Sequence, residues 1–528
     1  MRAPIAALLA GGLLVTACGG NTNTSNSSGS SAGTKHGDTL TVAIGIDPDT
    51  LDPAAGTTTT SEQVVDMMAE PLVTIDPQGA VKPLLATSWT TAADGLSYVF
   101  TLHSGVKFSD GTDFNAAAVK FNFDRLLNPS TFKAQPNVLA AIGSVEATDA
   151  THVKFLLKTP LAAFVEALTQ SAGDIISPAS VNASPNTPAQ IQQPIGTGPY
   201  KFKERVAGDH ITMVRNDGYW GQKPNYDTQV YKVVPEATSR EALVKAGQAG
   251  VAMLPPANDL PALRNDPNLK VFLSPSDRTV QMIIDTVDPV NPLLQKPEVR
   301  QALNYAIDKK TIIDKVMFGA AVPLDAPMSK ALAGYCPVGN YDFDLAKAKK
   351  MLADNGAAGM KVRIISPTGR YVQDIQVAGA VASYLRDAGL QVEGPATRDW
   401  PSYVAGVVLA TPAKQAEIAD IHLLGWAPAY LDASQQFEQF YSPRMAPKGP
   451  ESSFYKNPTV DALITKSNAE SNQQAREKDQ CAAAKLIWSD APWIFLVNQK
   501  LPLIISSKVT GVTGIPNEKF NTVYASPV

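Results

Sequence analysis

Residues 298–317 read EVRQALNYAIDKKTIIDKVM, a stretch with a strong helical period. Its apolar side chains are spaced so that they fall on one side of a helix, at Val299, Leu303, Ala306 and Ile307. The pattern predicts one amphipathic helix over the whole stretch. Arg300 lies beside the apolar stripe and is expected to form a salt bridge within the protein rather than to bind a ligand.

Further helices and strands alternate on both sides of this segment. Runs of β-branched and aromatic residues predict strands at 39–44, 97–102, 152–157, 210–214, 361–365 and 492–497. Helical spacing predicts helices at 115–127, 345–355 and 375–388. Gly356 and Gly389 follow the last two helices as stop signals. The alternation predicts an α/β protein.

Length and composition exclude several classes of protein. At roughly 150 residues per domain, 528 residues predict two to four domains or one large multi-lobed body. Hydrophobic residues make up 44% and charged residues 18%, which excludes a largely disordered chain. The net charge of -4 comes without a run of Lys or Arg, so no nucleic-acid partner is expected. A mean hydropathy of -0.07 excludes a polytopic membrane protein.

The N-terminus has the pattern of an export signal. Arg2 precedes an apolar run from 5 to 15, which is too short to span a bilayer, where roughly 20 residues are needed. Small residues before Cys18 resemble the lipobox of bacterial lipoproteins. The resemblance implies a signal peptide over 1–17 and a lipid on Cys18, and the Gly-, Ser- and Asn-rich residues 18–38 form a predicted flexible tether. A secreted protein with an incidental cysteine is the alternative.

Two further cysteines, Cys336 and Cys481, complete the set of 3. An exported chain is in a compartment that permits disulfides, so a bridge between them is predicted. Two buried thiols are the alternative.

Motifs of catalysis and metal binding are missing from the sequence. It contains no G-x-S-x-G, H-E-x-x-H or P-loop pattern, and its 5 histidines form no local metal motif. We therefore expect no enzyme, no cofactor and no metal site. A secreted hydrolase would need a nucleophile and a base that the sequence does not offer.

Eight short blocks follow one another along the chain in a familiar order. They are TLDP (50–53), AEPLV (69–73), PLLATSW (83–89), DGLSYVFTL (94–102), VKFSDGT (106–112), GTGPY (196–200), RNDGYW (215–220) and VRQALNYAID (299–308). Their order and spacing resemble the extracellular solute-binding proteins of family 5, the oligopeptide, dipeptide and nickel receptors of ABC importers. The resemblance covers nearly everything from Thr39 to the C-terminus.

The resemblance implies a periplasmic-binding-protein-like fold of two hinged lobes (type II, cluster C), with an extra domain inserted in one lobe. Implied boundaries are lobe I at 39–68, 190–282 and 498–528, the extra domain at 69–189, and lobe II at 283–497. Ligand binds between the lobes, which close over it.

The stretch LGWAPAYLD, residues 424–432, is the most informative part of the resemblance. Peptide receptors of the family carry an aspartate where Ala429 stands, and this aspartate pairs with the α-amino group of the peptide. A buried ammonium without a carboxylate is costly, so either Asp432 or another acid substitutes, or the ligand lacks a free amine. The other implied ligand contacts are Thr57, Thr58, Thr59, Arg370, Tyr371, Trp400, Trp426 and Tyr430.

Together these features predict a lipid-anchored receptor on the outer face of the bacterial cell membrane. It is expected to be a monomer that captures peptides or a peptide-like solute and delivers them to ABC permease subunits. Two alternatives remain: a receptor for a non-peptide solute such as a metal chelate, a glycoside or an opine-like compound, and a sensor that does not transport.

Overall fold

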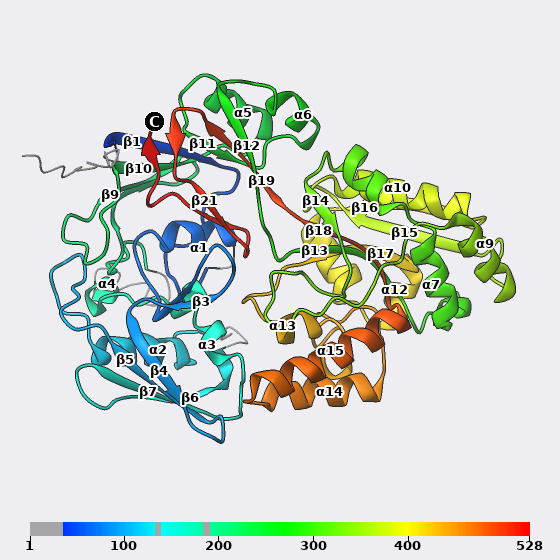
Figure 1. Cartoon of the computed structure of the whole chain (residues 1–528), viewed down its shortest axis with the longest axis horizontal. Coiled ribbons are helices and arrows are strands. Elements are labelled where there is room, and N and C mark those ends of the chain that lie inside the picture. The colour runs from blue at the N-terminus through cyan, green and yellow to red at the C-terminus, as the bar shows by residue number, and fades with distance from the viewer. Residues whose placement is uncertain (1–34, 57, 133–138, 183–190) are drawn as a thin grey trace, which may run out of the picture. The chain divides into compact units, whose positions relative to one another are not determined.

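The computed structural model describes residues 35–56, 58–132, 139–182 and 191–528 (Figure 1). The predicted signal peptide, Cys18 and all but the last residues of the predicted tether lie outside this part of the chain. Within it, no helix combines the length and the apolar composition needed to cross a bilayer.

The first sheet has seven strands drawn from distant parts of the sequence. They are β1 (Gly37–Ile44), β8 (Tyr200–Val206), β9 (His210–Arg215), β10 (Tyr226–Val233), β11 (Val251–Met253), β12 (Leu269–Ser274) and β19 (Leu501–Ser506). Their order is β12-β19-β11-β1-β10-β9-β8. Central β1 runs parallel to both of its neighbours, and the other pairs are antiparallel.

The second sheet has six strands in the order β14-β18-β13-β17-β15-β16. They are β13 (Thr279–Ile284), β14 (Ala321–Pro323), β15 (Lys361–Pro367), β16 (Gln391–Arg398), β17 (Ile421–Trp426) and β18 (Trp493–Gln499). Helices α7 (Pro297–Tyr305), α9 (Leu345–Asp354) and α10 (Asp374–Asp387) cover one face. Helices α13 (Ala433–Phe437), α14 (Pro458–Ala469) and α15 (Gln473–Asp490) cover the other.

The third sheet is antiparallel, with four strands in the order β4-β5-β7-β6. They are β4 (Ala86–Thr91), β5 (Ser97–Leu102), β6 (Ile142–Ala147) and β7 (His152–Leu157). Helix α2 (Ala116–Leu127) packs on it through Phe123, whose ring lies 4.8 Å from that of Phe155. The hairpin β2 (Val73–Ile75) and β3 (Val81–Pro83) and helix α3 (Phe164–Ala167) belong to the same stretch of sequence.

The remaining elements are short. The helices are α1 (Thr59–Val65), α4 (Pro178–Asn182), α5 (Ala237–Lys245), α6 (Leu260–Leu263), α8 (Lys309–Thr311), α11 (Trp400–Tyr403) and α12 (Pro412–Ile418). The strands are β20 (Val509–Thr510), β21 (Thr513–Ile515), β22 (Lys519–Asn521) and β23 (Ser526–Pro527).

The chain passes twice between the first and second sheets (Figure 1). Residues 275–278 join β12 to β13, and Lys500 alone separates β18 from β19. The predicted lobe boundaries at 282/283 and 497/498 fall inside β13 and β18, and each of these strands lies wholly in the six-stranded sheet. The domain boundaries remain predictions.

The predicted α/β class is confirmed, and so are the six predicted strands and three of the four predicted helices. Asn115 caps α2 by accepting from the Ala118 amide at 3.1 Å, which explains why that helix begins where its apolar spacing does. Gly356 and Gly389 follow α9 and α10 with φ of 74° and 95°, a conformation that glycine adopts without strain.

The prediction of a single helix over 298–317 is wrong. Helix α7 ends at Tyr305, and the short α8 begins after Asp308, whose carboxylate accepts from the Thr311 amide at 2.9 Å. A side chain that bonds its own backbone in this way starts a new helix and competes with continuation of the old one. The apolar stripe of α7 is nevertheless buried as predicted.

Arg300 is buried, but it does not form the expected salt bridge. Within the described residues its guanidinium bonds only main-chain carbonyls, those of Leu294, Gln295, Asp490 and Ala491, at 2.5–3.1 Å. Burial lowers its pKa to about 10. Arg300 therefore ties α7 to the end of α15 through carbonyl dipoles.

Three of the sequence blocks meet at Glu70, which is buried. Its carboxylate accepts hydrogen bonds from Thr197 Oγ1 at 2.7 Å, Tyr219 Oη at 2.7 Å and Trp220 Nε1 at 2.9 Å. Burial raises the pKa of Glu70, and these donors act in the opposite direction. The blocks at 69–73, 196–200 and 215–220 thus have a structural role.

Candidate ligand-binding site

The candidate site is built where β17 ends, at Gly425 and Trp426. Tyr371, on the loop after β15, donates its hydroxyl to the Gly425 carbonyl at 3.0 Å. A Cβ on Gly425 would lie 2.6 Å from a ring carbon of Tyr371, so only glycine fits this contact. The contact fixes the loop that carries Arg370 and Tyr371 against the strand that ends in Trp426.

Arg370, Tyr371 and Trp400 form one cluster. The rings of Tyr371 and Trp400 pack edge to face at 6.0 Å. The guanidinium carbon of Arg370 lies 5.3 Å from the Tyr371 ring centre and 5.1 Å from that of Trp400. Asp374 supports the loop by accepting from the Arg370 amide at 2.7 Å. Three residues that the resemblance implied as ligand contacts therefore form a cationic and aromatic wall.

A second cation near this wall is already neutralised. Arg278, between the first two sheets, is bonded to Glu518 through two hydrogen bonds, one of them 2.8 Å from Nε to Oε1. Its guanidinium also lies 5.7 Å from the Tyr371 ring centre. Burial alone would raise the pKa of Glu518, but the charges of Arg278 and Arg370 leave it lowered. Sequence reasoning missed this pair because neither residue belongs to a motif.

Arg370 has no such partner. Within the described part of the chain no carboxylate comes within ion-pair distance of its guanidinium. Desolvation by its neighbours and the charge of Arg278 lower its pKa, although it remains a cation at neutral pH. An anionic group of a ligand would find in Arg370 an exposed cation held in place by two aromatic rings.

Two buried polar groups adjoin members of these contacts in sequence. Trp426 Nε1 and Asn517 Oδ1 are buried and have no hydrogen-bond partner among the residues described. Trp426 follows Gly425, and Asn517 precedes Glu518. Buried polar groups in proteins are normally paired, whereas this indole donor and this amide acceptor have no partner among the described residues.

Tyr430 and Asp432 belong to a different cluster. Tyr430 is buried against Ala167 of α3 and Ala163, the residue before that helix. The Asp432 carboxylate accepts from Arg476 Nη2 at 2.5 Å and caps α13 by accepting from the Ser434 amide at 2.8 Å. Its other oxygen, Oδ2, has no partner among the described residues.

The acid at 432 is thus already paired, while Ala429 is exposed. Glu166, also on α3, adds another carboxyl here, and burial together with the charge of Asp432 raises its pKa. A role for Asp432 or Ala429 in ligand binding remains a prediction.

The threonine loop precedes α1. Thr58 caps this helix, since its hydroxyl accepts from the Ser61 amide at 3.2 Å and bonds the Ser61 hydroxyl at 2.9 Å. Thr59 is the first residue of the helix. Thr57 lies outside the described residues. Ligand contacts of these threonines remain predictions.

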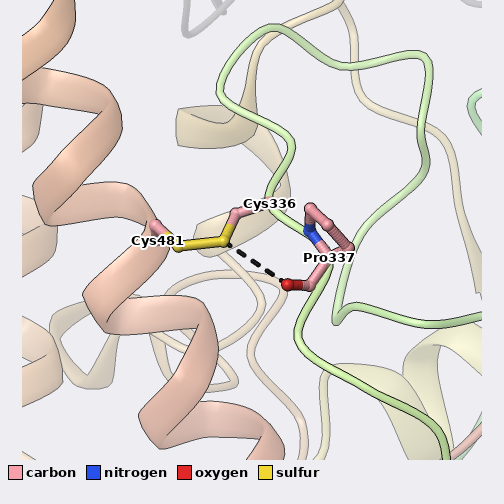
Figure 2. The surroundings of a disulfide bond; sticks show 3 residues. All are labelled: Cys336, Pro337 and Cys481. Atoms are coloured by element: carbon pink, nitrogen blue, oxygen red, sulfur yellow. Dashed lines mark hydrogen bonds between the residues drawn. A yellow bond between two sulfur atoms is a disulfide. The ribbon is translucent and has the colours of Figure 1, made fainter.

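A disulfide joins Cys336 to Cys481 on α15 (Figure 2). Their Cα atoms lie 5.3 Å apart across 145 positions of sequence. Nearby, Ala333 pairs with the segment after the candidate site: its amide donates to the Leu431 carbonyl at 3.0 Å, and its carbonyl accepts from the Ala433 amide at 2.9 Å. The disulfide therefore tethers to α15 the loop that is hydrogen-bonded to residues 431–433.

In the part of the chain that the structure describes, no group of three or more His, Cys, Asp or Glu residues is arranged to hold a metal ion. His422, which lies near Trp426 in sequence, is buried. It bonds Gln415 Nε2 at 3.1 Å and Ser452 Oγ at 3.0 Å, and burial lowers its pKa to about 3. His422 is therefore a neutral core residue.

Comparison with protein families and curated proteins gives matches over most of the chain. A sequence model described as bacterial extracellular solute-binding proteins, family 5 middle, matches residues 80–447. The glutathione-binding protein GsiB of Pectobacterium atrosepticum is 31% identical over 489 residues, which cover 91% of this chain and 92% of GsiB.

Solved structures of periplasmic binding proteins share the fold of this chain. The ABC transporter-associated periplasmic binding protein DppA of Helicobacter pylori, solved with the peptide STSA, is 25% identical with a TM-score of 0.74, over 93% of this chain and 98% of its own. AgaA from A. tumefaciens R10, solved with agropinic acid, is 26% identical with a TM-score of 0.70, over 91% of this chain and 95% of its own. The predicted periplasmic-binding-protein-like fold is confirmed.

Proposed function

Since the chain belongs to the bacterial extracellular solute-binding proteins of family 5, the substrate-binding components of ABC importers, we propose that it captures a short peptide or peptide-like solute that carries a carboxylate. The observation that carries this proposal is the Arg370 guanidinium, held over two aromatic rings without a carboxylate partner in the described residues. Binding takes place between two hinged lobes, and the loaded protein delivers the solute to its permease.

Glutathione-class tripeptides fit the groups at the site. Glutathione carries two carboxylates and one ammonium group at neutral pH, and a relative that is 31% identical is named as a glutathione-binding protein. One carboxylate pairs with Arg370, while Trp426 Nε1 and Asn517 Oδ1 bond the amide groups. The aromatic rings of Trp400 and Trp426 pack on the ligand backbone. The ammonium group pairs in this proposal with Asp432 Oδ2, which has no partner among the described residues; because Asp432 is buried, ligand entry must open the cluster around Tyr430 and Asp432.

Replacing Arg370 with methionine is expected to weaken glutathione binding by roughly 10- to 150-fold. A hydrogen bond to a charged group contributes about 1.5–3 kcal/mol, which gives this range of Kd. Isothermal titration calorimetry on the wild type and R370M measures the loss. Arg386→Met is the matched control, because Arg386 is also exposed but bonds main-chain carbonyls at 392 and 394.

A ligand series separates the two ends of the solute. When Arg370 is replaced, the C-terminal amide of glutathione should lose less affinity than the free acid. The amide has no carboxylate at that end, so it makes no ion pair with Arg370 that the replacement could remove. N-acetylation should weaken binding to the wild type if the ammonium group is captured. Equal binding of glutathione to the wild type and R370M would overturn the assignment of Arg370.

A non-peptide carboxylic acid is the second candidate. Ala429 stands where the peptide receptors of the resemblance carry an aspartate, and AgaA, 26% identical, was solved with agropinic acid. Such a ligand would keep the contact with Arg370 and would not need the ammonium partner. No binding of any peptide in the titrations, together with binding of an opine-type acid that R370M abolishes, would favour this candidate.

We propose that the receptor acts as a monomer held at the outer face of the bacterial cell membrane by a lipid on Cys18. The lipobox-like sequence before Cys18 and the polar tether after it support this proposal. A lipid anchor keeps a receptor close to its permease without fixing its orientation.

Cys18→Ser is expected to move the protein from the membrane fraction to the medium or periplasm, because a hydroxyl cannot take the thioether-linked lipid. Fractionation with immunodetection measures the shift, and Ser27→Ala in the predicted tether serves as the control that keeps Cys18. An intact mass of the wild-type protein without a lipid increment would contradict the proposal.

A further inference from the structure

Lys309 is a buried cation for which the described residues provide no counter-ion. It is the first residue of α8, and only 7% of it is exposed. Its ammonium group makes no hydrogen bond or ion pair within the described part of the chain. It lies 5.8 Å from the ring centre of Tyr341 and 5.7 Å from that of Trp488, and these two rings stack on each other at 5.1 Å.

The side chain faces a cavity of about 230 Å³ in the six-stranded half of the protein, beside β14 and ahead of α9. The walls combine apolar and polar side chains: Ile307, Asp308, Lys309, Lys310, Pro323, Leu324, Asn340, Tyr341, Asp342 and Phe343. Phe343 is 44% exposed, which is unusual for a large apolar side chain. None of the residues assigned to the proposed solute site lines this cavity.

The other charged groups of the cavity do not neutralise Lys309. Asp308 uses its two carboxylate oxygens on the amide and hydroxyl of Thr311, at 2.9 and 2.7 Å. Lys310 is exposed and pairs with Asp314. Asp342 is exposed at the rim of the cavity and acts on Lys309 only through the electrostatic attraction of its charge. Burial lowers the pKa of Lys309 to about 8, and the charge of Asp342 opposes that shift.

We propose that this cavity is a second binding site, separate from the solute site, which takes a small carboxylate with a short apolar tail. The carboxylate pairs with the Lys309 ammonium group. The tail packs on Pro323, Leu324 and Phe343 around the mouth.

The chemistry of the walls selects this class of ligand. A buried ammonium group is stabilised most by an anion that reaches it in the low-dielectric interior. Apolar walls disfavour phosphate and other ions that keep a full hydration shell. A neutral molecule of the same shape would bury the same apolar surface but leave the cation unpaired, and a cationic one would add repulsion.

Butyrate is the probe, because it has one carboxylate and a three-carbon tail. Titration of the full-length protein with butyrate, followed by the thermal midpoint at constant ionic strength, should show a saturable increase. Butyramide has the same shape without the charge and should give none. Lys309→Met should weaken butyrate binding at least tenfold, whereas Lys315→Met, at an exposed lysine that does not line the cavity, should leave it unchanged.

A chemical readout does not depend on the stability of the variant. Acetylation of Lys309 by an activated ester, followed by peptide mass spectrometry, should slow at least tenfold in saturating butyrate, while acetylation of the exposed Lys315 should not change. Protection of Lys309 by butyrate but not by butyramide supports the site. No saturable effect of butyrate, an equal effect of butyramide, or equal binding by K309M would each overturn it.

Discussion

Replacing Arg476 with methionine is expected to lower the free energy of unfolding by about 3–5 kcal/mol, because the change leaves Asp432 charged and unpaired in the interior. The side chains of Arg476 and Asp432 are 2% and 0% exposed, and their nitrogen and oxygen lie 2.5 Å apart. Methionine fills most of the space without the charge. Urea unfolding followed by circular dichroism measures the loss.

Two controls separate the unpaired charge from lost packing. The double variant R476M/D432N removes both charges and keeps a good helix cap at the start of α13, so it should recover most of the loss. Lys466→Met breaks the ion pair between Lys466 and Asp479. The Lys466 side chain is 64% exposed, so this change should alter stability by less than about 1 kcal/mol. A loss in R476M no larger than that in K466M would contradict the prediction.

The same pair bears on ligand capture. A ligand ammonium group that reaches Asp432 meets a carboxylate that already serves Arg476 and the cap of α13, with only Oδ2 left. R476M/D432N should therefore remain folded and lose whatever affinity the free amine contributes. A folded double variant that still distinguishes glutathione from its N-acetyl derivative would move the amine contact to another acid.

Local patterns were sufficient to predict most of the elements but not where every helix ends. Alternating runs such as 97–102 became strands because alternate side chains, those of Tyr98, Phe100 and Leu102, face one core. The apolar stripe of 299–307 continues past the point where α7 stops, so periodicity alone extended the helix too far. The decisive signal is Asp308 three residues before Thr311, an ordinary cap pattern that the stripe concealed.

The candidate site was predictable only where one segment carried several of its residues. Arg370, Tyr371, Trp400 and Trp426 lie at or just after the ends of strands of one sheet, and the family resemblance assigned them together. Arg278 and Glu518 are 240 positions apart, and neither stands in a motif. Only the return of the chain through β19 and on to the turn between β21 and β22 brings them together. Lys309 reads in sequence as one of two ordinary surface lysines, and burial alone distinguishes it.

The double variant Cys336→Ala, Cys481→Ala is expected to lower the free energy of unfolding by about 2–5 kcal/mol. A disulfide stabilises by restricting the unfolded chain, and the effect grows with the length of the closed loop. Here the bridge spans 145 positions, near the upper part of the range. Urea unfolding of the double variant against the oxidised wild type measures the loss, and the wild type with reductant provides a second comparison.

The loss should also be local, because the bridge holds a loop that pairs with the segment after the candidate site. Ala333 exchanges hydrogen bonds with Leu431 and Ala433, and Gly334 packs against Gln480 beside Cys481. Without the bridge, the Ala333 and Ala433 amides should exchange hydrogen for deuterium faster than those of β13, which lies in the six-stranded sheet outside this loop. Equal protection in the double variant would mean that packing on α15, rather than the bridge, positions this loop. In that case the stability loss would come from the unfolded chain alone, and ligand affinity should not change.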